Sequence, residues 1–428
     1  MSAQTTEDRV ALRSAWSRLP RVPLFELLVA FSLFPAVYVG ADRLQPVEAV
    51  APASAYHLAV GGATVVAIAV FLYDRRVYPL SAFVLVAYLL FVGWAIYSLR
   101  WTVGNDGYTD YKLHRMIVFN TLLLAFGLVL AQSRRRVVAF GLVMGVVGLW
   151  LSAEAVYASY VLGEFAFVTV GSENYLTHGR AIGFAAPLLA YVLFAHPQYS
   201  LRVLAGALLA ALVVGSMVAG GRGPFVAIVV ALATFAILEG LAAGVQRRIS
   251  ARGLLATAAA TVGVGAAVAL AVRSLDGTPW AIERLLVARE SDEAETRLFM
   301  LREAYGFWRE EPLRGHGIGS YDVMTATVHD YPHNVVVEVL AELGLVGLAL
   351  AALVVLPPLL ACFYARFSGG DALYSALVAL FVFMFVNASL SFDLHANRQL
   401  FFAAGLMALA WTEAEAGWLS RSFPREDS

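Results

Sequence analysis

The residues best suited to chemistry are polar side chains that stand where apolar segments begin. His333 and Asn334 close a polar stretch of roughly 60 residues that starts at Arg273, and an apolar segment follows them directly. A helix N-terminus disfavours an imidazolium, so His333 would stay neutral near pH 7 and could accept a proton. His333 is therefore a candidate general base, and a structural histidine at a helix end fits the same residues equally well.

A second candidate site surrounds Arg222, which lies between Gly221 and Gly223 and is followed by Pro224. Glycines allow close approach to the backbone, and proline suits the first turn of a helix. A guanidinium beside a helix N-terminus can bind a phosphate together with the backbone N–H groups. A tight turn between two helices would give the same pattern.

Other apolar segments also begin at cationic or polar residues. These residues are Lys112, His114, Arg115, His178, Arg180, Asn397 and Arg398. If they share one membrane face, their charges and the helix dipoles can hold an anion there. The alternative is that basic residues simply mark helix ends at the lipid headgroups.

Within the polar stretch, the pattern predicts an amphipathic helix over 292–310. Its apolar stripe consists of Leu298, Leu301, Tyr305 and Trp308, and the stripe is expected to face the membrane or the bundle. Arg297 and Arg302 would then border a cavity, whereas a solvated helix with paired surface charges is the alternative. The glycines at 315, 317 and 319 predict a flexible turn.

Composition determines the class of protein. The chain is 60% hydrophobic and 14% charged, with a mean hydropathy of +0.73, which is typical of polytopic membrane proteins. A net charge of −1 does not indicate a nucleic-acid-binding protein. Cys362 is the single cysteine and cannot form an intramolecular disulfide. No Asp-x-Asp motif occurs in the sequence. We therefore expect neither a metal site nor a cofactor.

We predict an all-α polytopic membrane protein with about twelve transmembrane helices and one large outer insert containing short amphipathic helices. About 20 apolar residues are needed to cross a bilayer. Runs of that size lie at 22–40, 56–72, 79–99, 116–131, 137–160, 180–195, 201–219, 224–238, 253–272, 335–357, 372–390 and 400–416.

Basic residues predict the orientation. With a cytoplasmic N-terminus, 16 of the 30 Lys and Arg residues fall inside, against 7 outside when the long insert is left out. Both termini are thus expected in the cytoplasm. The predicted organisation is a tail at 1–21, helices 1–9 within 22–272, the outer insert at 273–333, helices 10–12 within 334–416, and a tail at 417–428.

Several motifs together resemble one family. They are Gly-Arg-Gly-Pro at 221–224, Glu-Thr-Arg-Leu at 295–298, Glu-Pro-Leu-Arg-Gly-His-Gly-Ile-Gly at 311–319, Pro-His-Asn at 332–334, Glu-Leu-Gly-Leu-Val-Gly at 342–347 and Asp-Leu-His-Ala-Asn-Arg at 393–398. The chain resembles the O-antigen ligase and O-antigen polymerase superfamily, strongly from about Met217 to Leu350 and mostly in topology before that.

This resemblance implies a metal-independent glycosyltransferase of the bacterial inner membrane with a periplasmic site. Its glycan donor would be linked to undecaprenyl diphosphate, and its acceptor would be a saccharide hydroxyl such as that of lipid A–core. His333 matches the family's general base, and Arg222 and Arg297 match the arginines that hold the diphosphate. Arg302 could replace Arg297 in that role. We add Arg180 to this arginine set and expect support from Asn334, Gly221, Gly223 and Arg398.

Two alternatives remain open from the sequence. A polymerase of O-antigen or exopolysaccharide would use the same glycan donor and differ only in the acceptor. A transporter of lipid-linked glycans would also have many helices, but internal repeats and helices broken at mid-membrane would be expected. Neither feature is evident in the sequence.

Overall fold

Helices are the regular elements in the part of the chain that the computed structural model describes, residues 23–34, 55–74, 79–163, 174–196, 198–245 and 292–414. In chain order they are α2 (Leu24–Leu33), α5 (Ala55–Asp74), α6 (Pro79–Tyr97), η1 (Ser98–Arg100), α7 (Asp106–Arg115), η2 (Met116–Asn120), α8 (Thr121–Leu130), α9 (Arg134–Tyr160), α10 (Tyr175–Gly183), α11 (Ala186–Ala195), α12 (Tyr199–Val218), α13 (Arg222–Val245), α16 (Asp292–Glu310), α17 (Tyr321–Met324), α18 (Val335–Phe367), α19 (Leu373–Ala388) and α20 (Arg398–Met407).

Seven helical stretches are long and apolar enough to cross a membrane. They are Ser81–Arg100, Asp106–Leu130, Arg134–Tyr160, Tyr175–Ala195, Tyr199–Val218, Arg222–Val245 and Val335–Phe367. Each coincides with a predicted span, so the all-α membrane class is confirmed. Leu24–Leu33, Leu58–Ala69 and Leu373–Ala388 are shorter apolar helices, and the span predicted at 253–272 lies outside the described residues. The total of twelve stays a prediction.

The fourth span starts ten residues earlier than the apolar pattern indicates. The side chain of Asn105 accepts a hydrogen bond from the Gly107 N–H at 2.9 Å and so caps α7. The helix then continues through the π-helical turn η2 into α8. The prediction relied on apolar runs, and α7 carries many polar residues, so the start of this helix was missed. Lys112 and Arg115 therefore lie within a helix and not in a loop before one.

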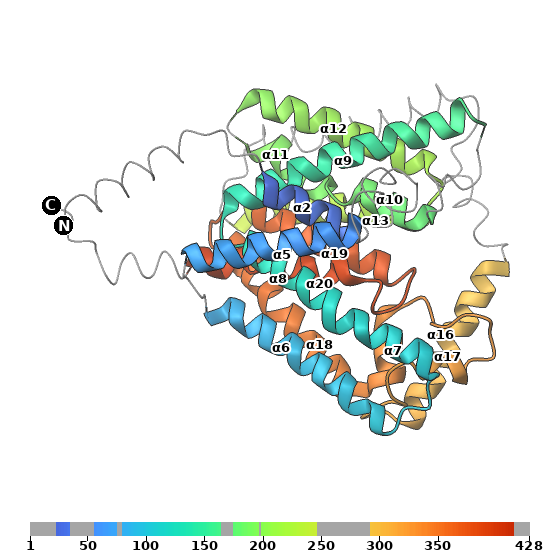
Figure 1. Ribbon diagram of the computed structural model, residues 1–428. Helices are drawn as coiled ribbons and strands as arrows, with labels where there is room; N and C mark the ends of the chain where they lie inside the picture. The colour runs from blue at the N-terminus through green and yellow to red at the C-terminus, as the bar shows by residue number, and fades with distance from the viewer. Residues whose placement is uncertain are drawn as a thin grey trace, which may run out of the picture.

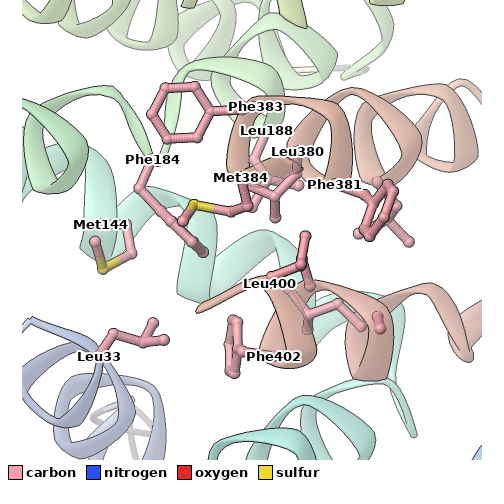
Figure 2. Packing of buried hydrophobic residues seen from close by; sticks show 14 of the residues in the cluster. Leu33, Met144, Phe184, Leu188, Leu380, Phe381, Phe383, Met384, Leu400 and Phe402 are labelled. Carbon is pink, nitrogen blue, oxygen red and sulfur yellow. The ribbon is translucent and has the colours of Figure 1, made fainter. Parts of the chain in front are cut away.

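The core of the bundle is packed with aromatic side chains. Phe184 contacts Phe34, Phe140 and Phe402 at ring-centroid distances of 5.6, 6.0 and 6.1 Å, and Figure 2 shows Phe184 and Phe402 among these buried residues. Helices α8 and α20 cross so closely that a Cβ on Gly405 would lie 2.6 Å from the Leu124 carbonyl oxygen. The absence of a side chain on Gly405 permits this crossing. Small residues at such crossings are typical of helix packing in membranes.

Helix α16 exists as predicted, but a different face of it packs on the bundle. Met300 and Ala304 are buried and Phe307 is half-buried, and Ala304 and Phe307 pack with Tyr321 and with α18. Leu298 and Tyr305 of the predicted stripe are about half exposed, at 48% and 52%. The bundle contact thus falls on a second stripe, which also has helical spacing, and contact of the predicted stripe with the membrane stays a prediction. Figure 1 shows α16 and α17 at one end of the bundle, beside α7.

Helix α18 is broken at Gly344, whose φ is 65°. The freed groups bond to the segment 312–317: the N–H groups of His316 and Gly317 donate to the carbonyls of Ala341 and Glu342 at 3.0 and 2.8 Å. A Cβ on Gly344 would lie 2.3 Å from the Leu313 carbonyl oxygen, so only glycine fits. The continuous helix expected over 335–357 is therefore two helices, and the first is a short rod that begins beside His333.

The segment 315–319 is tightly held, and the prediction of a flexible turn was wrong. Its glycines have φ values of 64°, 94° and 75°, and a Cβ on Gly317 would lie 2.4 Å from Thr102 Cα. Trp101 Nε1 and Thr102 Oγ1 donate to the carbonyls of Gly315 and Ile318 at 3.1 and 2.8 Å. The glycines serve close backbone packing, so the end of the polar insert is fixed to the helix bundle.

Ion pairs fix a second part of the bundle. Arg366 forms a two-bond contact with Glu239, at 2.7 Å for each bond, and Arg134 does the same with Glu413 at 3.0 and 2.8 Å. Asp371 also lies 3.0 Å from Arg134. These contacts join α9, α13, α18 and the turn before α19 with the residues that follow α20, which keeps the helices in register.

Candidate functional site

The connection between α19 and α20, residues 389–397, is the point where the candidate residues meet, and we call it the 389–397 loop. Asn334 Nδ2 donates to the Ser389 carbonyl at 3.2 Å, and Arg297 Nη1 donates to the next carbonyl, Leu390, at 3.1 Å. A Cβ on Gly223 would lie 3.8 Å from the Leu390 side chain. The starts of α13 and α18 and one face of α16 therefore converge on two consecutive loop residues.

His333 has a constrained backbone. Its φ is 56°, in the left-handed region, which is uncommon for a residue other than glycine. The next residue, Asn334, caps α18 because its side chain accepts hydrogen bonds from the N–H groups of Val336 and Val337, each at 3.1 Å. The imidazole ring packs edge-on against Tyr331 and His329, with ring centroids 4.6 and 5.3 Å apart. The ring is therefore held in one orientation.

The surroundings of His333 keep it neutral. Burial, the positive charge of Arg297 and the neighbouring His329 lower its pKa to about 4. Its Nδ1 atom is buried and has no hydrogen-bond partner among the described residues. A neutral imidazole with an open nitrogen is the form that accepts a proton. The helix start supports the same state, as expected from the sequence.

Arg180 is completely buried and shapes the 389–397 loop. Its Nη1 atom donates to Asn397 Oδ1 at 2.8 Å, and its Nη2 atom donates to the carbonyls of Asn387 and Ser391 at 2.7 and 2.9 Å. The guanidinium lies 4.5 Å from the ring centroid of Phe392, whose φ of 64° is also left-handed. Direct binding of a diphosphate by Arg180 stays a prediction, because these loop contacts engage both terminal nitrogens.

Arg222 opens α13, directly after Gly220 and Gly221. Gly220 has a φ of 81°, which permits the sharp turn out of α12. Gly221 is buried beside Pro224, and the half-buried Arg222 follows at the first helical position. The positive end of the helix dipole and this arginine thus lie at the same end of α13.

Arg297 and Arg302 occupy different surroundings on α16. Arg297 is half-buried and contacts the 389–397 loop, whereas Arg302 is exposed. The structure therefore brings Arg297, and not Arg302, to His333. Arg398, at the first position of α20, is 9% exposed. It is buried at the end of the same loop.

A buried cluster of charged residues lies next to the site, and the sequence pattern did not predict that its members pair. Lys112 Nζ lies 2.5 Å from Glu338 Oε1 and 2.7 Å from Glu342 Oε2, and all three side chains are shielded from solvent. Glu338 Oε1 also accepts the Leu394 N–H at 3.0 Å. Glu338 and Glu342 are four residues apart in an apolar helix. Carboxylates in such a segment usually have a partner and a role, and this spacing was the available signal.

Asp393 connects this cluster to a second histidine. Tyr108 Oη donates to Asp393 Oδ2 at 2.8 Å, and His395 Nδ1 lies 2.6 Å from the same oxygen. Burial opposes ionisation of Asp393, but the contact with His395 and the charge of Lys112 outweigh it and lower its pKa to about 2. His395 thus has a carboxylate partner, which His333 lacks among the described residues. The sequence did not reveal this pairing.

His316 has a structural role. Its Nε2 atom lies 2.9 Å from the Phe307 carbonyl, and its backbone N–H bonds to α18. Within the described ranges, no group of three His, Cys, Asp or Glu residues could hold a metal ion. The chemistry that these residues can supply is proton transfer by histidine and electrostatic binding of an anion by arginine.

The fold and the site define a polytopic membrane protein with a neutral histidine and several arginines gathered at one loop. The family model described as O-antigen ligase matches residues 165–352, from the segment before α10 into the second part of α18. This stretch of the chain belongs to the O-antigen ligase-like superfamily, as the motifs predicted. His333, Arg222, Arg297 and Arg180 lie inside the match, whereas Lys112 and the 389–397 loop lie outside it. No curated protein matches the chain significantly.

This family assignment indicates glycan transfer of the ligase or polymerase type in a bacterial membrane. It also implies a lipid-linked glycan and an acceptor as reaction partners, together with membrane lipid.

Proposed function

We propose that the chain transfers a glycan from undecaprenyl diphosphate to the hydroxyl of another saccharide, such as lipid A–core, at the periplasmic face of the inner membrane. The observation that carries this proposal is the convergence of Asn334, which follows His333, of Arg297 and of the Arg222 end of α13 on Ser389 and Leu390. The site supplies both groups that the reaction needs: a base for the hydroxyl and positive charge for the diphosphate.

The transfer is a single displacement. The acceptor oxygen forms a bond to the anomeric carbon while the bond from that carbon to the phosphate oxygen breaks, and its electron pair leaves with undecaprenyl diphosphate. The hydroxyl proton moves to His333. Arg297, Arg222 and the α13 dipole stabilise the developing charge on the leaving group. Attack opposite to the leaving group inverts the anomeric centre.

Purified protein in lipid nanodiscs tests this proposal. With an undecaprenyl-diphosphate-linked glycan and lipid A–core, we expect a glycosylated acceptor and release of undecaprenyl diphosphate. The reaction should continue in EDTA, because arginines and a helix dipole replace a metal in our mechanism. Transfer that stops in EDTA and returns with a divalent ion would contradict the mechanism.

Two other functions are separated by the same assay. A polymerase using this glycan donor would lengthen the lipid-linked glycan when no lipid A–core is supplied. A transporter would move the intact glycan lipid and form no glycosidic bond. The break in α18 gives little support to transport, because its freed backbone groups bond to the segment 312–317 of the same chain.

The proposed orientation makes a separate prediction. Cysteines introduced at Glu295 in α16 and at the 95% exposed Val328 should react with an impermeant thiol reagent added to the periplasm. A cysteine at Gly244, at the far end of α13, should not react, because a helix of 24 residues spans about 36 Å. The native Cys362 is buried and serves as the unlabelled control. The reverse pattern would place the site in the cytoplasm.

A further inference from the structure

We propose that the bound diphosphate of the glycan donor activates His333: the anion neutralises Arg297, and His333 becomes an effective base only in the donor complex. This inference rests on the proposed function, and it concerns the order of events at the same site. A free enzyme with a weak base would not deprotonate hydroxyls before the glycan donor is in place.

Geometry supports this coupling between His333 and Arg297. The side chain that follows His333, Asn334, binds the Ser389 carbonyl, and Arg297 binds the adjacent Leu390 carbonyl. Adjacent carbonyls of one loop thus hold the cation and the segment carrying the histidine. The left-handed backbone of His333 and its contacts with Tyr331 and His329 hold the ring in this position.

Within the described part of the chain, no carboxylate is paired with His333 in the way that Asp393 is paired with His395. Among the described residues, the charged and titratable groups that act on it or on its neighbours are Arg297 from α16, His329 and Tyr331 from its own segment, Asp393 from the 389–397 loop, and Arg180 from α10. Asp393 would favour the imidazolium, but its carboxylate is engaged with His395 at 2.6 Å and Tyr108 at 2.8 Å. A negative charge bound beside Arg297 would stabilise a proton on His333.

The electrostatics of the free protein agree with this view. Burial and Arg297 lower the pKa of His333 to about 4, so its basicity is poor without the glycan donor. Binding of a diphosphate beside Arg297 should raise this pKa by about 1 unit or more, because a neighbouring opposite charge favours the protonated form. The proton taken from the acceptor hydroxyl is then held by an imidazolium that faces an anion.

Histidine NMR on the full chain tests the proposal with farnesyl diphosphate as the probe, with Cε1-labelled histidine and His333→Asn for assignment. In wild-type protein, the probe should raise the pKa of His333. Arg297→Gln should raise this pKa without the probe and remove the response to the probe. Arg297→Lys keeps the charge and should keep the low value. The control is Arg302→Gln, an exposed arginine of the same helix, which should behave like wild-type protein.

Kinetics provide an independent readout. Activity falls with pH below the pKa of a base, and kcat reports the donor complex whereas kcat/KM reports the free enzyme. The acid limb of kcat should therefore lie at higher pH than that of kcat/KM. Binding of the probe with an unchanged pKa of His333 would overturn the activation and leave the proposed transfer intact. Failure of the probe to bind, together with an active His333→Asn protein, would overturn both.

Discussion

Replacement of His333 by alanine or asparagine is expected to lower the rate of glycan transfer by roughly 10²- to 10⁴-fold, the usual contribution of a general base. His333 is neutral, is held by Tyr331 and His329, and starts the segment that Asn334 anchors to the 389–397 loop. Asparagine is the sharper variant, because it adopts left-handed backbone more readily than alanine and so preserves the φ of 56°. Binding of the lipid-linked glycan should persist in both variants.

Three other histidines provide matched controls for this experiment. His114 is exposed on α7, and its replacement by alanine should leave the rate close to wild type. His329→Ala and His316→Ala should lose much less than His333→Ala, because His329 acts as a neighbour of the ring and His316 bonds to a backbone carbonyl. A His333→Asn protein that reaches the membrane and transfers glycan at a wild-type rate would exclude His333 as the base.

The second large effect is expected at the arginines. Arg222→Ala and Arg297→Ala should each weaken use of the lipid diphosphate by about 1.5 to 3 kcal/mol, the contribution of a hydrogen bond to a charged group. This loss corresponds to roughly a 10- to 150-fold lower kcat/KM. Arg222→Lys should recover only part of it, because an ammonium lacks the two parallel N–H bonds of a guanidinium.

Arg302→Ala is the matched control, since Arg302 lies on the same helix as Arg297 and is exposed. Its kcat/KM should stay within about twofold of wild type, as surface charges contribute little. Protein amount in the membrane should be measured for every variant by fluorescence-detected gel filtration. Equal transfer by wild type and Arg297→Ala would remove Arg297 from the glycan donor site, and a loss at Arg302 equal to that at Arg297 would reverse their assignment.

The sequence by itself determined the class of protein, the approximate positions of seven spans and the family that residues 165–352 match. Apolar runs of about 20 residues are a local property, and so is the Asn334 cap at the start of α18. A local pattern does not decide which side of a helix packs on the bundle when two apolar stripes both have helical spacing. Helix α16 has two stripes at helical spacing, and only contact with α18 decided that Met300 and Ala304 are buried.

The tertiary structure alone decided which charges meet. Lys112 pairs with Glu338 across 226 residues of sequence, and Arg180 reaches Asn397 across 217. No local pattern specifies such partners, because a buried ion finds its counter-ion through the packing of whole helices. The same holds at the 389–397 loop, which polar segments far apart in the chain reach together. The sequence predicted the histidine and the arginines as candidates, and the fold placed Arg297 against that loop and left Arg302 exposed on α16.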